Sequence, residues 1–158
     1  MIEEFNKIKQ KLDGAGIEYR TIEHGDKPED SDRALGYDPD DRPHHAGAKA
    51  IVIKGRKSKN YYHFTLPDDC RLDQKKVKAV IGERWSFAPG EEVKEVTHCI
   101  PGSVPPFGSC IGLQTHIAKA LTDNEKIFFN AGSLTNSIEM RLEDFVVVEK
   151  PIEVDVTE

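Results

Sequence analysis

The chain has 158 residues, 37% of them hydrophobic and 32% charged, and its net charge is −6. This length predicts a single domain over residues 1–158 with a core of its own, and the lack of a long apolar run argues against a membrane protein. The acidic balance argues against DNA binding and against a broad grip on any nucleic-acid backbone, so contact with RNA has to be local. Three irregularly spaced cysteines and a charged N-terminal pattern favour reduced thiols and a cytoplasmic setting.

The N-terminal part of the chain predicts a helix, a strand and a long loop. Ile8 and Leu12 continue a helical spacing of apolar residues over 2–13, and glycines follow it. Residues 17–21 alternate between apolar and polar, which is typical of a strand. Residues 25–47 hold three prolines and several aspartates, so we expect a long loop around the mouth of the domain.

Residues 46–55 predict a buried strand with a cation at its entrance. An apolar, β-branched run from Ala50 to Ile53 lies between glycines, and Lys49 precedes it. Because side chains alternate along a strand, Lys49 shares the face of Ile51 and Ile53. Two interpretations follow: the lysine stem covers apolar surface while its ammonium reaches water, or the ammonium binds an anion at the mouth of a pocket.

The later elements alternate short strands with two helices, which favours an α+β domain with a mixed, partly closed sheet and helices outside it. The predicted strands are 61–66, which forms a hairpin with the preceding strand, then 85–87, 111–117, 126–130, 137–141 and 145–148. The predicted helices are 74–81, capped by Asp73 and ended by Gly82 with Val77, Val80 and Ile81 inward, and a helix that opens at Pro89 and runs to 96. We expect the tail, 151–158, to be loose.

Two glycine-containing loops are candidates for a binding site. Residues 97–108 contain two glycines and three prolines, which fix an unusual loop, and Gly102 is the natural point of close approach. Such a loop can direct backbone N–H groups at an anion or a carbonyl oxygen, or it can be a rigid connector between a helix and a strand. The corner at 130–133 has the same two interpretations.

Four motifs in this order and spacing resemble the YbaK and prolyl-tRNA synthetase-associated editing domain family, over about residues 17–145. The motifs are Gly47-Ala48-Lys49-Ala50 before an apolar strand, Leu66-Pro67-Asp68 with Arg71-Leu72-Asp73, Pro101 to Gly108, and Phe129-Asn130-Ala131-Gly132 with Ser137-Ile138. The resemblance implies a mixed β-barrel of about seven strands surrounded by helices. It also implies hydrolysis of the ester in a mischarged aminoacyl-tRNA, without a cofactor, a metal or a protein nucleophile.

The resemblance also implies which residues form the site. Lys49 matches the essential lysine, expected to hold a phosphate or ribose oxygen of the terminal adenosine of the tRNA. Gly102 lies in the loop whose amides hold the ester carbonyl and the aminoacyl amine. The other expected substrate-binding residues come from these two loops and from the end of the first strand, and they are His24, His98, Pro101, Ser103, Phe107, Asn130, Ala131, Gly132 and Ser133.

Three residues depart from the family pattern. His98 stands where the family usually has Gly, Ala118 where many members have Asp, and Leu134 where many alanine-acting members have His. His98 either occupies pocket volume, where a neutral imidazole could orient water, or turns to solvent. The other two departures remove polar groups from the expected site, so that either specificity has moved or activity has weakened.

The remaining cations, histidines and thiols suggest weaker hypotheses. The main local cationic clusters, and therefore the expected RNA contacts, are Arg56, Lys57, Lys59, Lys75 and Lys76. His98, Cys99, Cys110 and His116 lie near one another in sequence, but their spacing matches no usual zinc pattern. Cys99 has no evident histidine partner and is interpreted as packing rather than as a nucleophile.

The leading hypothesis is a free-standing trans-editing deacylase for a small amino acid, alanine first, on a tRNA such as that for proline. The alternative is a module that binds the acceptor end of tRNA without turnover, docked on an aminoacyl-tRNA synthetase. The departures at His98, Ala118 and Leu134 keep this alternative open. The oligomeric state is not predicted.

Overall fold

The computed structural model describes residues 2–26 and 45–158, so most of the long loop predicted over 25–47 lies outside the described residues. The described helices are α1 (Ile2–Gly14), α3 (Gln74–Ile81), α4 (Gly90–Thr97) and α5 (Leu142–Glu149), with the short 3-10 helices η1 (Gly108–Ile111) and η2 (Lys119–Leu121). The described strands are β1 (Tyr19–Glu23), β2 (His45–Gly55), β3 (Tyr61–Pro67), β4 (Trp85–Phe87), β5 (Thr115–Ala118), β6 (Lys126–Asn130), β7 (Asn136–Arg141) and β8 (Ile152–Val154). None of these helices is both long and apolar enough to cross a membrane.

The described strands form one mixed sheet in the order β1-β7-β6-β2-β3-β5-β8, with β4 paired to β2. The pairs β2–β6, β3–β5 and β5–β8 are parallel, and the other pairs are antiparallel. The mixed α+β class is therefore confirmed. No pairing among the described strands joins β1 to β8, so the sheet is open and the expected barrel is not confirmed.

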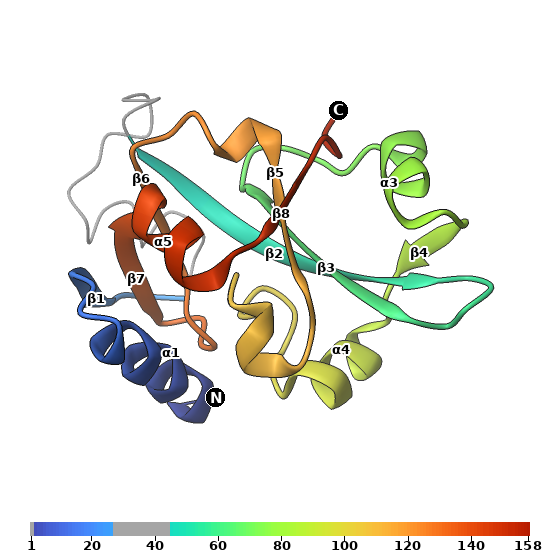
Figure 1. The fold of residues 1–158 in the computed structure, drawn as a ribbon. Coiled ribbons are helices and arrows are strands. Elements are labelled where there is room, and N and C mark those ends of the chain that lie inside the picture. Colours follow the sequence, from blue (N-terminus) through green and yellow to red (C-terminus); the bar gives the residue numbers. More distant parts are fainter. Residues whose placement is uncertain (1, 27–44) are drawn as a thin grey trace.

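The long strand β2 connects the two halves of this sheet (Figure 1). Residues 48–54 pair with β3 along one edge. On the opposite edge β2 changes partners, because residues 45–47 pair with β6 and residues 53–55 pair with β4. Between these two pairings the edge from Ala48 to Val52 faces no described strand, so its backbone groups need other partners.

Lys49 lies inside β2 and not at its entrance, which corrects the expectation from the sequence. His45, expected in the loop, and residues 46–47, at the start of the predicted strand, already pair in parallel with Lys126–Phe128 of β6, so β2 begins well before Lys49. This pairing could not be predicted from the local sequence, because the partner strand lies about eighty residues away in the chain.

The described residues form three apolar clusters, and the two larger ones are built as follows. Ile8 and Leu12 of α1 pack into one cluster with Phe107 and Phe145, and all four side chains are fully buried. Phe64, Leu66, Val77 and Trp85 belong to the second cluster, between the sheet and α3. The helix predicted over 2–13 and the strands predicted over 61–66, 85–87, 126–130 and 137–141 are confirmed, within one residue at their ends.

Helix α3 begins and ends where its capping residues predicted. The Asp73 side chain accepts a hydrogen bond from the Lys76 N–H, and Gly82 ends the helix in the left-handed conformation. Val77 is buried as expected. Val80 is exposed, so the prediction that it faces inward was wrong.

Three predictions near the C-terminus were wrong. Residues 145–148 form part of α5 and not a strand, because Leu142, Phe145 and Glu149 recur at helical spacing and are buried while Val146 and Val147 face outward. The strand predicted over 111–117 begins only at residue 115. The tail is ordered: β8 pairs with β5, and Val156 is fully buried.

A buried carboxylate fixes the end of the loop that precedes η1. Glu149 accepts hydrogen bonds from Lys11 Nζ (3.1 Å), from Ser109 Oγ and N, and from Thr115 Oγ1 (2.6 Å). Thr115 Oγ1 in turn accepts the Gly108 N–H at 2.7 Å. These contacts join α1, η1, β5 and α5. The donors take the place of the water molecules that the Glu149 carboxylate loses on burial.

We expect His63 to make the fold sensitive to acid. His63 is fully buried, its Nε2 contacts the Pro105 carbonyl oxygen at 2.8 Å, and burial lowers its pKa. The unfolded chain binds this proton below a pH of about 6.5, whereas the folded chain resists it, so the free energy of unfolding falls as the pH drops below that value. Burial lowers the pKa of His116 too, which adds in the same direction.

Urea unfolding between pH 5.5 and 8 checks this expectation. His63→Gln keeps an N–H donor but removes the titration, so its free energy of unfolding should depend less steeply on pH, by about 1 kcal/mol over the range. His98→Gln, at an exposed histidine, is the control. Equal pH dependence of the His63→Gln variant and the parent would contradict the expectation.

Candidate active site

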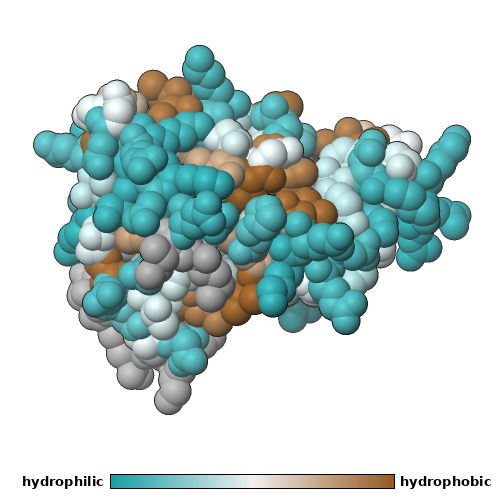
Figure 2. All heavy atoms as spheres, turned by 90° about the horizontal axis from the view of Figure 1, so that it is seen from below, coloured by the Kyte–Doolittle hydropathy of each residue, from teal (hydrophilic) through white to brown (hydrophobic). Residues whose placement is uncertain are grey.

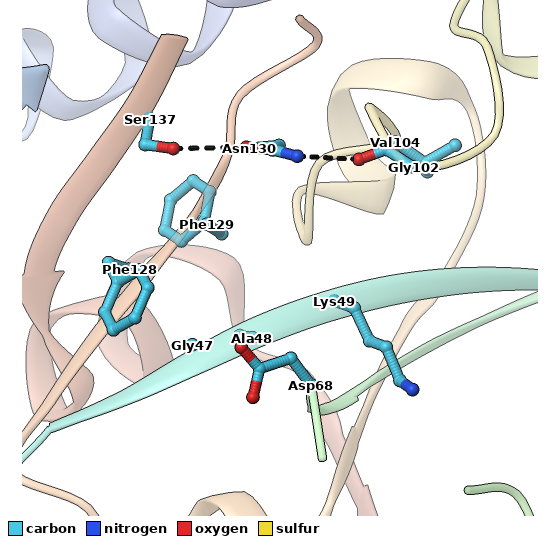
Figure 3. Close-up of a pocket in the computed structure, with 10 residues that line it drawn as sticks. All are labelled: Gly47, Ala48, Lys49, Asp68, Gly102, Val104, Phe128, Phe129, Asn130 and Ser137. Atoms are coloured by element: carbon cyan, nitrogen blue, oxygen red, sulfur yellow. Dashed lines mark hydrogen bonds between the residues drawn. The ribbon is translucent and has the colours of Figure 1, made fainter. Parts of the chain in front are cut away.

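A cavity of about 150 Å³, the Lys49 cavity, lies beside the interrupted edge of β2 (Figure 3). It is bounded by β2, by the ends of β6 and β7, and by the loop that follows α4. Its lining residues are Gly47, Ala48, Lys49, Asp68, Gly102, Val104, Phe128, Phe129, Asn130 and Ser137. Three residues that the sequence assigned to the site, Lys49, Gly102 and Asn130, therefore line one cavity.

The two glycine-containing loops bind each other directly. The Asn130 side chain donates from Nδ2 to the Gly102 carbonyl oxygen at 2.9 Å, and the Gly132 N–H donates to the Ser103 carbonyl oxygen at 2.9 Å. The Gly132 N–H is thus used within the protein. These two hydrogen bonds hold a loop between a helix and a strand against a corner of the sheet.

A chain of polar contacts runs from β1 to this junction. His24 Nε2 lies 2.7 Å from Ser137 Oγ, and Ser137 Oγ lies 3.1 Å from Asn130 Oδ1. His24 Nδ1 contacts the Gly25 carbonyl oxygen at 2.6 Å, so this nitrogen carries a proton. A hydroxyl has one proton, so Ser137 can donate to His24 or to Asn130 but not to both. His24 lies behind Ser137 and orients it rather than lining the cavity.

Gly102 needs the conformational freedom of glycine. Its φ of +91° lies where L side chains are strained, and a Cβ there would stand 3.3 Å from Leu134 Cδ2. Leu134, one of the three departures, therefore contacts the site. The Gly102 carbonyl is held by Asn130, whereas the described hydrogen bonds do not use the Gly102 N–H.

Lys49 and Asp68 form the other side of the cavity. A Cβ on Gly47 would stand 2.1 Å from Asp68 Oδ2, so only glycine allows this carboxylate to lie over β2. The Asp68 N–H also donates to the Gly47 carbonyl oxygen at 2.9 Å. In Figure 3 the Lys49 side chain runs away from Asn130 and Gly102. The ammonium is thus placed for a group that enters beside the loop junction, rather than for the junction itself.

The other expected substrate-binding residues shape the loops without lining this cavity. Pro101 lines a neighbouring apolar groove. Phe107 is fully buried against Phe129 and Phe145, with ring centroids 5.7 and 5.3 Å away, which excludes it from direct contact with a substrate in this cavity. Ser103 and Ala131 are fully buried, and Ser133 Oγ accepts the Thr135 N–H within its turn.

His98 and Ala118, two of the three residues that depart from the family pattern, both lie outside the lining of the cavity. His98 is exposed and ends α4 in the left-handed conformation, with φ of +61°, and it lines neither cavity. A left-handed C-terminal position is the usual place for Gly, so backbone conformation accounts for the Gly of the family. Ala118 is fully buried in the cluster around Leu66, outside the cavity lining.

Several residues that line the cavity were not predicted from the sequence as site residues. Asp68 and Ser137 were noticed only as parts of motifs, although a polar residue next to an apolar strand end is a signal for a site at that edge. Phe128 and Val104 gave no signal, because apolar residues in a strand or loop are more often core.

The residues expected to contact RNA do not form one surface in the structure. Arg56 and Lys75 lie around one hollow together with Lys78 and Arg84, which the sequence analysis had not selected. Lys76 instead contacts Asp155 Oδ1 at 3.2 Å and the Thr157 carbonyl oxygen at 2.8 Å. In the turn that contains Lys57 and Lys59, the backbone N–H groups of Lys57 and Ser58 donate to Glu83 Oε1, which fixes the turn.

Neither metal ligation nor a thiol stands out near the cavity. Within residues 2–26 and 45–158 there is no group of three or more His, Cys, Asp or Glu side chains that could hold a metal ion. Burial raises the pKa of the Cys99 and Cys110 thiols, so both stay protonated at neutral pH. Cys99 is fully buried in an apolar cluster with Val52 and Val104.

The fold is an α+β domain with a cavity where two loops meet, and comparisons with known proteins show its family. The family model of the aminoacyl-tRNA editing domain matches residues 23–147. The chain therefore belongs to the aminoacyl-tRNA editing domain family.

Among curated proteins, the chain is 32% identical over 109 residues to the multifunctional Ser/Thr-tRNA deacylase ProXp-y of Escherichia coli (strain K12). The match covers 66% of this chain and 65% of that protein, so it spans somewhat less than two thirds of the relative.

Solved structures share the fold. A proposed trans-editing enzyme for prolyl tRNA synthetase superposes with a TM-score of 0.80 at 20% identity, covering 98% of this chain and 97% of that chain. A scaffold protein from epitope backbone grafting superposes with a TM-score of 0.81 at 18% identity, covering 98% and 97%. At such identities the likeness extends to the fold alone.

We expect His98→Gly to stabilise the protein and to leave its amino-acid preference unchanged. Removing the Cβ relieves the left-handed strain at the end of α4, which should raise the free energy of unfolding by roughly 0.5–1 kcal/mol. Urea unfolding and a comparison of aminoacyl preferences check this. A changed preference would place the imidazole in the pocket despite its exposure.

Proposed function

We propose that this protein hydrolyses the ester bond of a mischarged aminoacyl-tRNA that carries a small amino acid, as a free-standing trans-editing factor. The observation that carries the proposal is the junction between the two loops, which borders the small Lys49 cavity. Membership of the aminoacyl-tRNA editing domain family supports it.

In this mechanism the protein positions the ester and polarises its carbonyl group, and water is the nucleophile. Water adds to the ester carbonyl carbon, the 3′ or 2′ oxygen of the ribose leaves with a proton, and the products are the free amino acid and the tRNA. The Gly102 N–H is the candidate donor for the developing oxyanion, because the Gly132 N–H already bonds Ser103. An activated ester needs an oriented water and an oxyanion site more than a strong nucleophile.

Lys49 would bind the acceptor end of the tRNA. Its ammonium points away from the loop junction, which suits a phosphate or ribose oxygen better than the ester carbonyl. Within the described residues Lys49 has no ion pair, so its charge is available to a ligand. A bound phosphate or ribose oxygen at this ammonium would then help to position the ester against Gly102.

The cavity favours a small amino acid that carries a hydroxyl over the alanine expected from the sequence. Its volume of about 150 Å³ limits the side chain, and Asn130 and Ser137 supply polar partners on one wall. The name of the E. coli relative specifies Ser/Thr-tRNA, which points in the same direction. We therefore place serine first and keep alanine as the closest competitor.

Deacylation assays with labelled seryl-, threonyl-, alanyl- and cysteinyl-tRNA test the proposal. We expect the protein to release serine or alanine faster than larger amino acids. Binding of the acceptor end without release of any amino acid would favour the alternative, a module that docks on a synthetase without turnover.

Lys49→Ala should lower the deacylation rate by roughly 10²-fold while leaving the fold intact, because a half-buried lysine at the cavity contributes mainly to the ligand. The matched control is Lys54→Ala, which removes a cation from the same strand where it pairs with Glu92 outside the cavity. Near-parental rates in a folded Lys49→Ala variant would move the active site elsewhere.

We further expect the tRNA to contact the hollow formed by Arg56, Lys75, Lys78 and Arg84. Changing Lys75 and Lys78 together to Gln should weaken binding and lower the slope of log affinity against log salt concentration by about 1 to 2. Lys76→Gln is the matched control, because Lys76 already contacts the C-terminal tail. An unchanged slope in the double variant would argue against this surface.

A further inference from the structure

An apolar groove of about 290 Å³ adjoins the Lys49 cavity and shares Gly102 and Val104 with it. Its other walls come from β2, from the end of β4 and from α4. Phe87 lies at this groove and is 57% exposed, although it is a large aromatic side chain. Figure 2 shows hydrophobic side chains gathered between hydrophilic ones on the face of the molecule where α4 lies. An exposed aromatic beside a site is a platform on which a nucleobase can stack.

The backbone of β2 also faces this groove. The Ala88 N–H donates to the Val52 carbonyl oxygen at 3.2 Å, so Val52 directs its backbone groups to this edge. Residues two apart in a strand direct their N–H and C=O groups to the same edge, so Ala50 does too. In the described part of the chain no strand pairs there, and Ala50 has no backbone hydrogen bond on that side. An adjacent donor and acceptor are thus presented inside an apolar groove.

We propose that this groove binds the adenine base of the nucleotide that carries the ester. The base would pack on Phe87, with its 6-amino group donating to the Ala50 carbonyl oxygen and its N1 accepting the Ala50 N–H. A purine with a 6-oxo group and a protonated N1 would place an acceptor against the Ala50 carbonyl oxygen and a donor against the Ala50 N–H. The groove would therefore reject it. This inference rests on the proposed function, because every tRNA ends in adenosine.

The sizes and positions of the two cavities support this division of the ligand. Cavities that enclose drug-sized ligands measure about 300 to 1,000 Å³, so the Lys49 cavity of about 150 Å³ is too small for a nucleoside together with its aminoacyl group. The groove starts at Gly102, where the ester is expected, and continues away from Asn130. The aminoacyl group would then lie on one side of Gly102 and the base on the other.

Binding of free nucleosides tests the inference without requiring turnover. Trp85 is the single tryptophan of the chain, and its ring centroid lies 5.2 Å from that of Phe87, so its fluorescence reports on the groove. We expect adenosine to change this fluorescence and to bind about tenfold more tightly than inosine, which differs only at positions 6 and 1 of the base. Neither nucleoside carries a phosphate, so the basic hollow does not contribute.

Phe87→Ala should weaken adenosine binding by about tenfold, because base stacking on an aromatic side chain is lost. Val147→Ala, at another exposed apolar residue, is the control. Because Phe87 lies next to Trp85, its substitution can change the fluorescence directly. A second measurement therefore uses chemically prepared seryl esters of adenosine and inosine as substrates. Phe87→Ala should raise KM for the adenosine ester and leave kcat nearly unchanged.

Equal affinity for adenosine and inosine, or adenosine binding unaffected by Phe87→Ala, would overturn the inference. A Phe87→Ala variant that changes the preference among amino acids would also overturn it, because the groove would then hold the aminoacyl group. These results leave the proposed deacylation standing if tRNA esters are still hydrolysed. Conversely, adenosine can bind when no ester is cleaved. Failure of the proposed adenine site and failure of the proposed deacylase activity therefore give different results.

Discussion

The interruption in the pairing of β2 is the constraint on which the candidate site depends. A strand inside a sheet must satisfy its backbone groups on both edges, and β2 exchanges β6 for β4 along one of them. The gap between these partners is where the Lys49 cavity and the apolar groove lie. Gly47, at the last position paired to β6, lets Asp68 approach the strand, and Lys49 follows two residues later.

Hydrogen bonds between irregular segments then give the gap a fixed shape. Asn130, at the end of β6, binds the Gly102 carbonyl, and Ser137 of β7 binds Asn130. Each such bond contributes only about 0.5–1.5 kcal/mol to stability, but their joint effect is to hold the Gly102 amide in one orientation. For hydrolysis of an activated ester, a donor already oriented before the reaction is worth more than a flexible one.

The parts of this structure that sequence could predict are those determined locally. Asp73 and Gly82 marked the ends of α3, and the proline-rich and glycine-rich loop at 97–108 was recognised as irregular. The failures depend on distant contacts. Residues 145–148, a phenylalanine and three β-branched valines, resemble a strand, yet burial of Phe145 against the first helix and loop favours α5. The polar contacts of Ser137 and the exposure of His98 follow from tertiary packing, which no local pattern contains.

In the proposed function the ester meets the protein at the junction of the two loops, beside the unpaired edge of β2. The most direct measurement follows backbone amide resonances while a non-hydrolysable 3′-amide analogue of seryl-adenosine is added. We expect the largest shifts at the amides of Gly102 and Ala50, with smaller shifts at Asn130. Shifts centred on the separate hollow that Arg20 and Glu139 line, with Gly102 unaffected, would contradict it.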